Sequence, residues 1–188
     1  QPNNFWSEEE EIMEEIKDEE SEVNYNGRHH LLNEFELLIY LNHPNILKAY
    51  GTYFGRQANP AILLEYCRYN LKEAINHLEN ADLVCVVYEI CSAMKYLHEN
   101  KIIHRDLNPN NILLNKKKHV KICDFGLARS IDDTSLLTSG IGTMHYMAPE
   151  IVFENEHYNE KVDVYSFGVV MHFILSKGNL KYPKLINE

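Results

Sequence analysis

Hydrophobic and polar positions along the first third of the chain predict one helix followed by two strands. Apolar residues recur at helical spacing over residues 28–41 and predict a helix. This helix should end at His43-Pro44, because the residue before a proline avoids the helical region. Residues 46–54 and 61–65 are apolar runs separated by a turn with Gly55 and Pro60, and they predict two paired strands.

The remainder of the chain predicts three helices and two short strands. A short helix is expected over residues 71–77, and residues 112–114 and 120–122 should form strands around a lysine-rich turn. A long helix should begin at Asp82, because apolar residues then repeat every three to four positions. Its stripe consists of Leu83, Val87, Ile90, Met94 and Leu97. Residues 162–175 are apolar on nearly every face, which predicts a helix buried inside a larger domain.

Composition and charge narrow the class of protein. The chain has 188 residues, 45% hydrophobic and 24% charged, as expected for one globular domain with a core. Its net charge is −10, but residues 8–22 alone contain ten acidic residues and one lysine. We therefore interpret residues 1–27 as an acidic, solvated N-terminal segment. The nearly neutral remainder shows no basic face, so we expect no nucleic-acid partner.

Two further features bear on the environment of the protein. The longest strongly apolar stretch, residues 164–175, is too short to span a bilayer, so we expect no membrane partner. The four cysteines at positions 67, 85, 91 and 123 form no C-x-x-C pair. They indicate reduced thiols in a reducing compartment, and hence a cytoplasmic location.

Three short strings carry the candidate chemistry. They are HRDLNPNN at residues 104–111, DFG at 124–126 and APE at 148–150. In this order and spacing they resemble the catalytic loop, the metal-binding motif and the end of the activation segment of eukaryotic protein kinases. The resemblance extends from residue 33 to residue 175 and is to the serine/threonine or tyrosine-kinase-like type. Any one string alone would be weak, because Asp and Asn are also common in turns.

The resemblance implies an α+β, protein-kinase-like fold with two lobes. Residues 28–188 would then form a partial kinase domain, with part of the small β-rich lobe and the first half of the large helical lobe. Because a glycine-rich loop and the later helices are not found, we expect a domain truncated at both ends. Residues 1–27 could include a remnant of the lysine-bearing strand.

The residue types fit phosphoryl transfer, which depends on positioning and charge neutralisation. Asp106 would orient the attacking hydroxyl, and Asn108 and Thr143 would lie beside it. Asn111 and Asp124 offer the oxygen ligands that Mg²⁺ prefers. The implied cofactors are ATP and Mg²⁺, and the implied partner is a protein substrate.

Other residues correspond to the nucleotide-binding positions of the family. Glu34 matches the glutamate that pairs with a phosphate-binding lysine, and Lys17 is the candidate for that lysine. The adenine would contact backbone groups of Glu65 and Cys67. Apolar contacts would come from Leu64 and Leu113. Glu34 could instead be a solvated helix residue, and residues 64–67 a plain edge strand.

Several departures from the family keep alternatives open. No G-x-G-x-x-G precedes Glu34, and Glu14 and Glu15 are unusual neighbours for a buried lysine. Asn108 stands where serine/threonine kinases usually have a lysine, so it supplies hydrogen bonds without charge. The sequence therefore predicts a protein serine/threonine kinase. The alternatives are a pseudokinase or scaffolding fragment without turnover, and a non-functional gene remnant.

Overall fold

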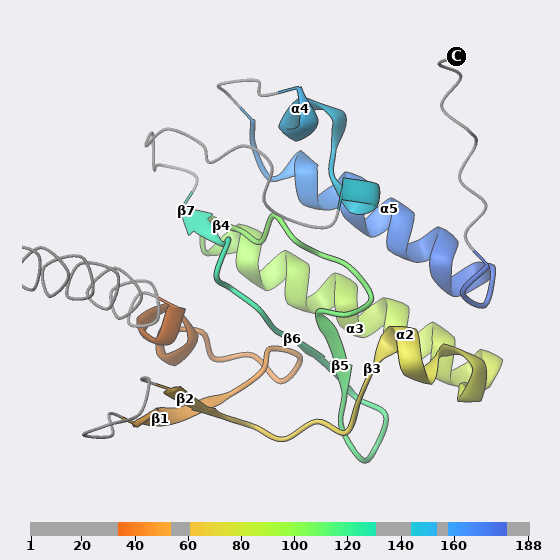
Figure 1. The fold of residues 1–188 in the computed structure, drawn as a ribbon, viewed down its shortest axis with the longest axis horizontal. Coiled ribbons are helices and arrows are strands. Elements are labelled where there is room, and N and C mark those ends of the chain that lie inside the picture. The colour runs from red at the N-terminus through yellow and green to blue at the C-terminus, as the bar shows by residue number, and fades with distance from the viewer. Residues whose placement is uncertain (1–33, 54–60, 131–143, 154–157, 180–188) are drawn as a thin grey trace, which may run out of the picture.

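A two-stranded ribbon, a three-stranded sheet and two long helices make up the architecture in the computed structural model (Figure 1). The structure describes residues 34–53, 61–130, 144–153 and 158–179. Residues 34–40 are helical, and the expected part of that helix before residue 34 lies outside the described residues. Strands β1 (Ala49–Tyr53) and β2 (Ala61–Leu64) pair antiparallel, with Tyr53 opposite Ala61. The first strand is therefore shorter than predicted.

The second sheet lies between the ribbon and the long helices. It contains β3 (Tyr69–Asn70), β5 (Ile112–Leu114) and β6 (Val120–Ile122) in the order β3-β5-β6. Ile46, predicted to lie in a strand of the ribbon, instead forms a parallel bridge with Ile122 of β6. The N–H of Leu47 donates to the carbonyl of Ile122 at 2.8 Å, so the chain leading into β1 is fastened to this sheet.

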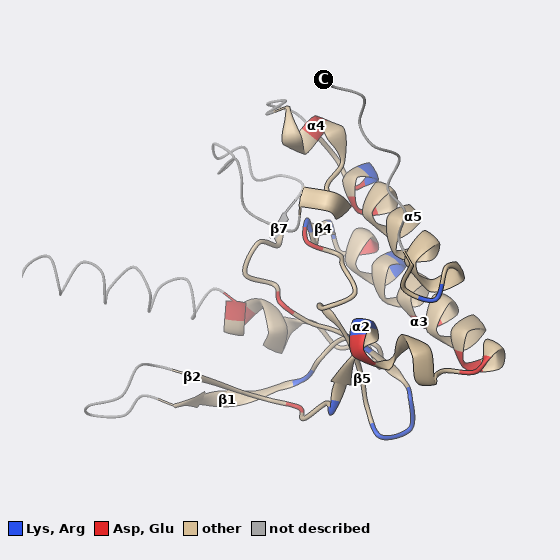
Figure 2. Ribbon diagram, turned by 45° about the vertical axis from the view of Figure 1, so that its right-hand side comes forward, with Lys and Arg blue, Asp and Glu red and all other residues tan. Residues whose placement is uncertain are grey.

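The lysine-rich turn between β5 and β6 projects from the sheet as predicted (Figure 2). A further two-residue pairing joins β4 (Ile102–Ile103) to β7 (Arg129–Ser130). Sequence reasoning missed β3, β4 and β7, because two residues are too few to show a periodic pattern.

The helices include two long ones that lie side by side (Figure 1). These are α3 (Asn80–Glu99) and α5 (Lys161–Leu175), and the short ones are α2 (Leu71–Ala74) and α4 (Pro149–Val152). Short 3₁₀ turns cover Ile75–His77 and Met144–Tyr146. Helix α3 begins two residues before the predicted start, because Asp82 belongs to its first turn and accepts a hydrogen bond from the N–H of Glu79 at 3.0 Å.

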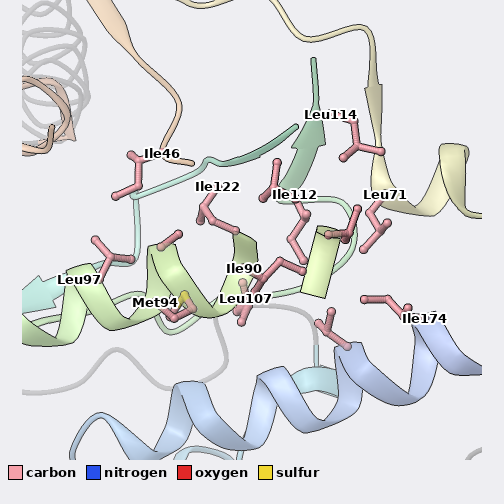
Figure 3. Close-up of a cluster of buried hydrophobic side chains, with 14 of the residues drawn as sticks. Ile46, Leu71, Ile90, Met94, Leu97, Leu107, Ile112, Leu114, Ile122 and Ile174 are labelled. Carbon is pink, nitrogen blue, oxygen red and sulfur yellow. The ribbon is translucent and has the colours of Figure 1, made fainter. Parts of the chain in front are cut away.

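The core lies between the three-stranded sheet and α5, with α3 in the middle (Figure 3). Ile90 and Leu97 on α3 are fully buried. Ile112 and Ile122 approach from the sheet, and Ile174 approaches from α5. Burial of each such side chain contributes about 1.5–3 kcal/mol, and this packing holds the loops that connect the elements.

Helix α5 is buried only on the side that faces the core. Val170 and Ile174 are buried, whereas Val164, Tyr165 and Leu175 are 51%, 45% and 77% exposed. The expectation that this helix is buried inside a larger domain is therefore not tested by the described residues, in which its outer apolar side chains are exposed. None of the helices in the described ranges has the length and hydropathy needed to cross a membrane.

Candidate active site

Two asparagine side chains hold the carboxylate of Asp106 in the loop between β4 and β5. Asn111 Nδ2 donates to Asp106 Oδ2 at 2.7 Å, and Asn108 Nδ2 donates to Oδ1 at 3.0 Å. Both amides also donate to the backbone carbonyl of Asp106, at 2.9 Å from Asn111 and 3.1 Å from Asn108. Three of the predicted site residues are thus in direct contact, and their spacing in the sequence follows from this short closed loop.

A carboxylate on α5 anchors the beginning of the same loop. Asp163 is fully buried and accepts hydrogen bonds at 2.9 Å from the backbone N–H groups of His104 and Arg105. Its Oδ2 also lies 2.8 Å from Nε2 of His98 on α3. Sequence reasoning placed Asp163 at the start of a helix but gave it no role. The signal that could have revealed its role is an acidic residue at the edge of an apolar run. If such a residue is buried, its carboxylate must be paired.

Arg105 adopts a left-handed backbone conformation with φ 67°. Its Nε donates to the carbonyl of Leu127, and its Nη1 donates to the hydroxyl of Tyr158 at 2.9 Å. The side chain therefore links the catalytic-loop candidate to the segment after DFG and to the chain just before α5. A non-glycine residue in this conformation is uncommon and is typical of functional loops.

The DFG segment is fastened to the loop on both sides of Asp124. The N–H of Cys123 donates to the carbonyl of Asn111 at 3.0 Å, and His104 Nε2 lies 3.1 Å from the carbonyl of Cys123. Phe125 is buried in the core, where its ring meets that of His104 edge-on at 5.1 Å. These contacts leave the side chain of Asp124 exposed at the surface of the site.

Asn111 and Asp124 fit a magnesium site. The Nδ2 of Asn111 is used by Asp106, so the amide oxygen is the atom left for a metal. The Asp124 side chain is exposed, and its segment is joined to that of Asn111 by the hydrogen bond from the N–H of Cys123. Magnesium in nucleotide sites is commonly held by one or two such oxygen ligands together with phosphate oxygens.

Glu34 lies next to the DFG segment. Burial and, to a smaller extent, the negative charge of Asp124 raise the pKa of Glu34, whereas a hydrogen bond from the backbone N–H of Phe125 lowers it. The structure thus brings Glu34 close to Asp124, two of the predicted site residues. The proposed partner Lys17 lies outside the described residues, as does Thr143.

The predicted adenine-binding residues lie where β2 ends and in β5. Leu64 closes β2, and the N–H of Glu65 donates to the carbonyl of Lys48 at 2.8 Å. Leu113 lies in the middle of β5 and is partly buried. Burial raises the pKa of Cys67, and the charge of Glu65 raises it further.

Two features of this region were not predicted from the sequence. The carboxylate of Glu65 forms a 2.8 Å ion pair with Lys121 of β6, which is 56 positions away along the chain. Cys123 lies next to Asp124, and burial first, then Asp124, raises the pKa of its thiol to about 12. No local pattern marks the ion pair or the burial of Cys123, because both depend on segments that meet only in the folded structure.

The folded elements and the loop define a class: an α+β domain in which one Asp and two Asn side chains cluster in a short closed loop. The family described as "Protein kinase domain" matches residues 7–184. The chain belongs to this protein kinase domain family. A chain in a crystal structure of the yeast RNA Pol II CTD kinase CTDK-1 complex has the same fold, with a TM-score of 0.72 and 27% identity. That match covers 79% of this chain and 50% of the other, and it confirms the predicted protein-kinase-like fold.

Curated relatives carry kinase names. The chain is 36% identical over 170 residues to inhibitor of nuclear factor kappa-B kinase subunit beta from Bos taurus, covering 82% of this chain and 22% of the relative. It is 38% identical over 169 residues to the alpha subunit from Xenopus laevis, covering 82% and 23%. It is 36% identical over 156 residues to serine/threonine-protein kinase RUNKEL from Arabidopsis thaliana, covering 80% and 11%. The chain therefore spans less than a quarter of the length of these relatives.

Proposed function

We propose that the protein transfers the γ-phosphoryl group of ATP to serine or threonine hydroxyls of protein substrates. The observation that carries this proposal is the carboxylate of Asp106, held on both oxygens by Asn108 and Asn111 and fastened to the segment that presents Asp124. Membership of the kinase family and the serine/threonine kinase named among the relatives support it.

Asp106 receives the proton in the proposed reaction. The substrate hydroxyl oxygen forms a bond to the γ-phosphorus while the bond from that phosphorus to the β–γ bridging oxygen breaks, and ADP leaves. The hydroxyl proton passes to the Asp106 carboxylate, which the two asparagine amides have already oriented. Asn111 and Asp124 would hold Mg²⁺, which neutralises phosphate charge when it is bound.

The remaining proposed roles concern nucleotide and substrate binding. Backbone groups of Glu65 and Cys67 would bind the adenine edge, between apolar contacts from Leu64 and Leu113. Two further roles involve residues beyond the described part of the chain. Lys17 would pair with Glu34, and Thr143 would contact Asp106. The free thiols support a reducing compartment such as the cytoplasm.

Separate losses of binding and of transfer test the proposal. In the full-length protein, Asp124→Ala should abolish the Mg²⁺-dependent thermal shift with ATP, because it removes a metal ligand. Asp106→Asn should keep that shift and lose transfer of radiolabelled phosphate, because it removes only the proton acceptor. Equal loss of the thermal shift in both variants would contradict the division of roles.

Asn108 favours a second candidate, a pseudokinase that binds nucleotide or partners without turnover. Its amide places a neutral donor on Asp106 Oδ1 at the position where serine/threonine kinases usually have a cationic lysine. A wild-type protein that shows the ATP thermal shift but no transfer to any substrate, including itself, would establish this second function and overturn the first.

A further inference from the structure

The ion pair between Lys121 and Glu65 differs from the other lysine pairs of the described region in its burial. The two side chains are only 14% and 22% exposed, and Lys121 Nζ lies 2.8 Å from Glu65 Oε2. The pair between Lys118 and Asp82 is as short, at 2.6 Å, but its lysine is 51% exposed. Solvent therefore screens the attraction within the first pair less than the attraction within the second.

Glu65 depends on Lys121 for its stabilisation. Within the described residues, its Oε2 is buried and has no hydrogen bond of acceptable geometry, although the ammonium group is in ionic contact. A buried carboxylate without a compensating charge is strongly unfavourable. Removal of the lysine should therefore favour movement of the Glu65 carboxylate toward solvent, which can shift the segment that carries it.

Each partner belongs to a different part of the proposed site. Glu65 follows β2 directly, in the segment proposed to bind adenine, and its N–H is bonded to Lys48 beside β1. Lys121 is the central residue of β6, three positions before Asp124. The pair thus joins the adenine segment to the strand that delivers the proposed metal ligand.

The strand on the lysine side is a rigid support. Asn45 donates through Nδ2 to the carbonyl of Val120 at 3.2 Å and accepts the N–H of Ile122 at 2.8 Å. Both neighbours of Lys121 are fully buried in the core. The adenine segment is therefore the partner whose position the pair can set.

We propose that the Lys121–Glu65 ion pair is a positioning device that places the adenine-binding segment relative to Asp124 and so sets the affinity for ATP. This inference rests on the proposed function and adds a determinant of nucleotide affinity to the same site. Both residues are positioning residues, since neither side chain is proposed to touch the reacting atoms.

Steady-state kinetics of the full-length protein test the inference through KM and kcat. Lys121→Met keeps the length of the side chain and removes the charge, and it should raise KM for ATP about tenfold while kcat changes less than about twofold. Glu65→Gln, which retains the shape and backbone of residue 65, should raise KM to a similar extent. The double variant should resemble either single variant, because one interaction is lost in all three.

Lys118→Met is the matched control, since it breaks the exposed pair on the same hairpin. It should leave KM and kcat at wild-type values. Thermal melting of each variant without nucleotide detects a general loss of stability. Such a loss would not by itself produce a selective rise in KM for ATP. If Lys121→Met fails to fold, the isosteric Glu65→Gln variant decides the matter alone.

The outcomes distinguish this inference from the proposed function. Wild-type turnover together with an unchanged KM in Lys121→Met or Glu65→Gln would overturn the inference alone. Additive effects in the double variant would also overturn it, because they would show that the two side chains act separately. A wild-type protein that neither binds nor turns over ATP with Mg²⁺ would overturn both the proposed function and the inference.

Discussion

The carboxylate of Asp163 on α5 accepts the backbone N–H of Arg105, with Oδ1 and the nitrogen 2.9 Å apart. Its other oxygen accepts the N–H of His104 and contacts His98. A single buried anion therefore fixes two consecutive peptide groups directly before Asp106. The proton acceptor proposed for phosphoryl transfer is positioned from a helix that begins 55 residues further along the chain.

Replacing this anion should damage both stability and transfer. Asp163→Asn puts an amide donor among N–H donors, so the free energy of unfolding should fall by about 2–4 kcal/mol. Urea denaturation measures this loss, and phosphate transfer should fall with it. Glu160→Gln, near the start of the same helix, is the control; it should leave transfer unchanged and lower stability far less than Asp163→Asn does. A stable, fully active Asp163→Asn variant would show that the loop does not depend on this anchor.

Asn108, one of the two asparagines bonded to Asp106, should affect chemistry more than nucleotide binding. Asn108→Ala removes the donor to Oδ1 and should lower kcat about tenfold, with KM for ATP within about twofold of wild type. The exposed Asn110 supplies a control, because Asn110→Ala keeps the backbone N–H that Asn108 accepts. An equal loss in both variants would point to a general disturbance of the loop.

Glu34 should oppose folding in the absence of ligands. Its pKa is raised by burial and then by Asp124, so the folded state favours the protonated carboxyl. That stabilising contribution is present below the unfolded-state pKa and is lost as pH rises through the folded-state pKa. At neutral pH, Glu34→Gln should therefore increase the melting temperature of the nucleotide-free protein.

Because Glu34 is only partly buried, solvent screening should keep this gain below about 1 kcal/mol. Phosphate transfer should fall in the same variant, since a neutral amide cannot pair with the proposed phosphate-binding lysine. Glu36→Gln, at an exposed position of the same helix, should change neither quantity. A lower melting temperature in Glu34→Gln would contradict the electrostatic argument.

His43 should make the fold sensitive to mild acid. Burial and then the charge of Lys121 lower its pKa below 6.5, while its ring accepts the N–H of Asn45 and stacks on Tyr96. The unfolded chain therefore binds a proton near pH 6.5 that the folded protein does not bind. Stability from this residue is complete above pH 6.5 and decreases as pH falls toward the folded-state pKa.

The free energy of unfolding should decrease by at most about 1.4 kcal/mol per pH unit through this one group. Urea denaturation between pH 7.5 and pH 5.5 measures the slope, with both pH values being about one unit from the ordinary histidine pKa. His43→Asn should flatten the slope, and His77→Asn, at an exposed site, should leave it unchanged. Equal slopes in wild type and His43→Asn would exclude His43 as the cause.

The local sequence was sufficient to predict the catalytic-loop candidate. It was insufficient to predict the contacts from distant segments that hold this loop in place. Asp106, Asn108 and Asn111 lie within six positions, so one closed loop brings their side chains together and the motif is visible in the sequence. The metal-ligand candidates Asn111 and Asp124 were predictable for a similar reason, since the β5–β6 hairpin connects them.

Contacts between distant segments account for most of what sequence reasoning missed. Lys121 pairs with Glu65 across 56 positions, and Asp163 binds the loop across 58 positions to Arg105. Neither contact produces a periodic or local pattern. The helices α3 and α5 were predictable because their apolar residues repeat, whereas the two-residue strands exist only through partners elsewhere in the chain.

The raised pKa of Cys123, the thiol beside Asp124, affects how this protein will respond to alkylating reagents. With a pKa of about 12, Cys123 is a thiolate in only about one molecule in 10⁵ at neutral pH. An electrophilic inhibitor directed at this sulfur would meet the unreactive, protonated form. Burial also raises the pKa values of Cys67 and Cys91, and the side chains of Cys85 and Cys91 are exposed on α3. Maleimide dyes should therefore label the outer surface of α3 while the sulfur next to the proposed metal ligand stays unmodified.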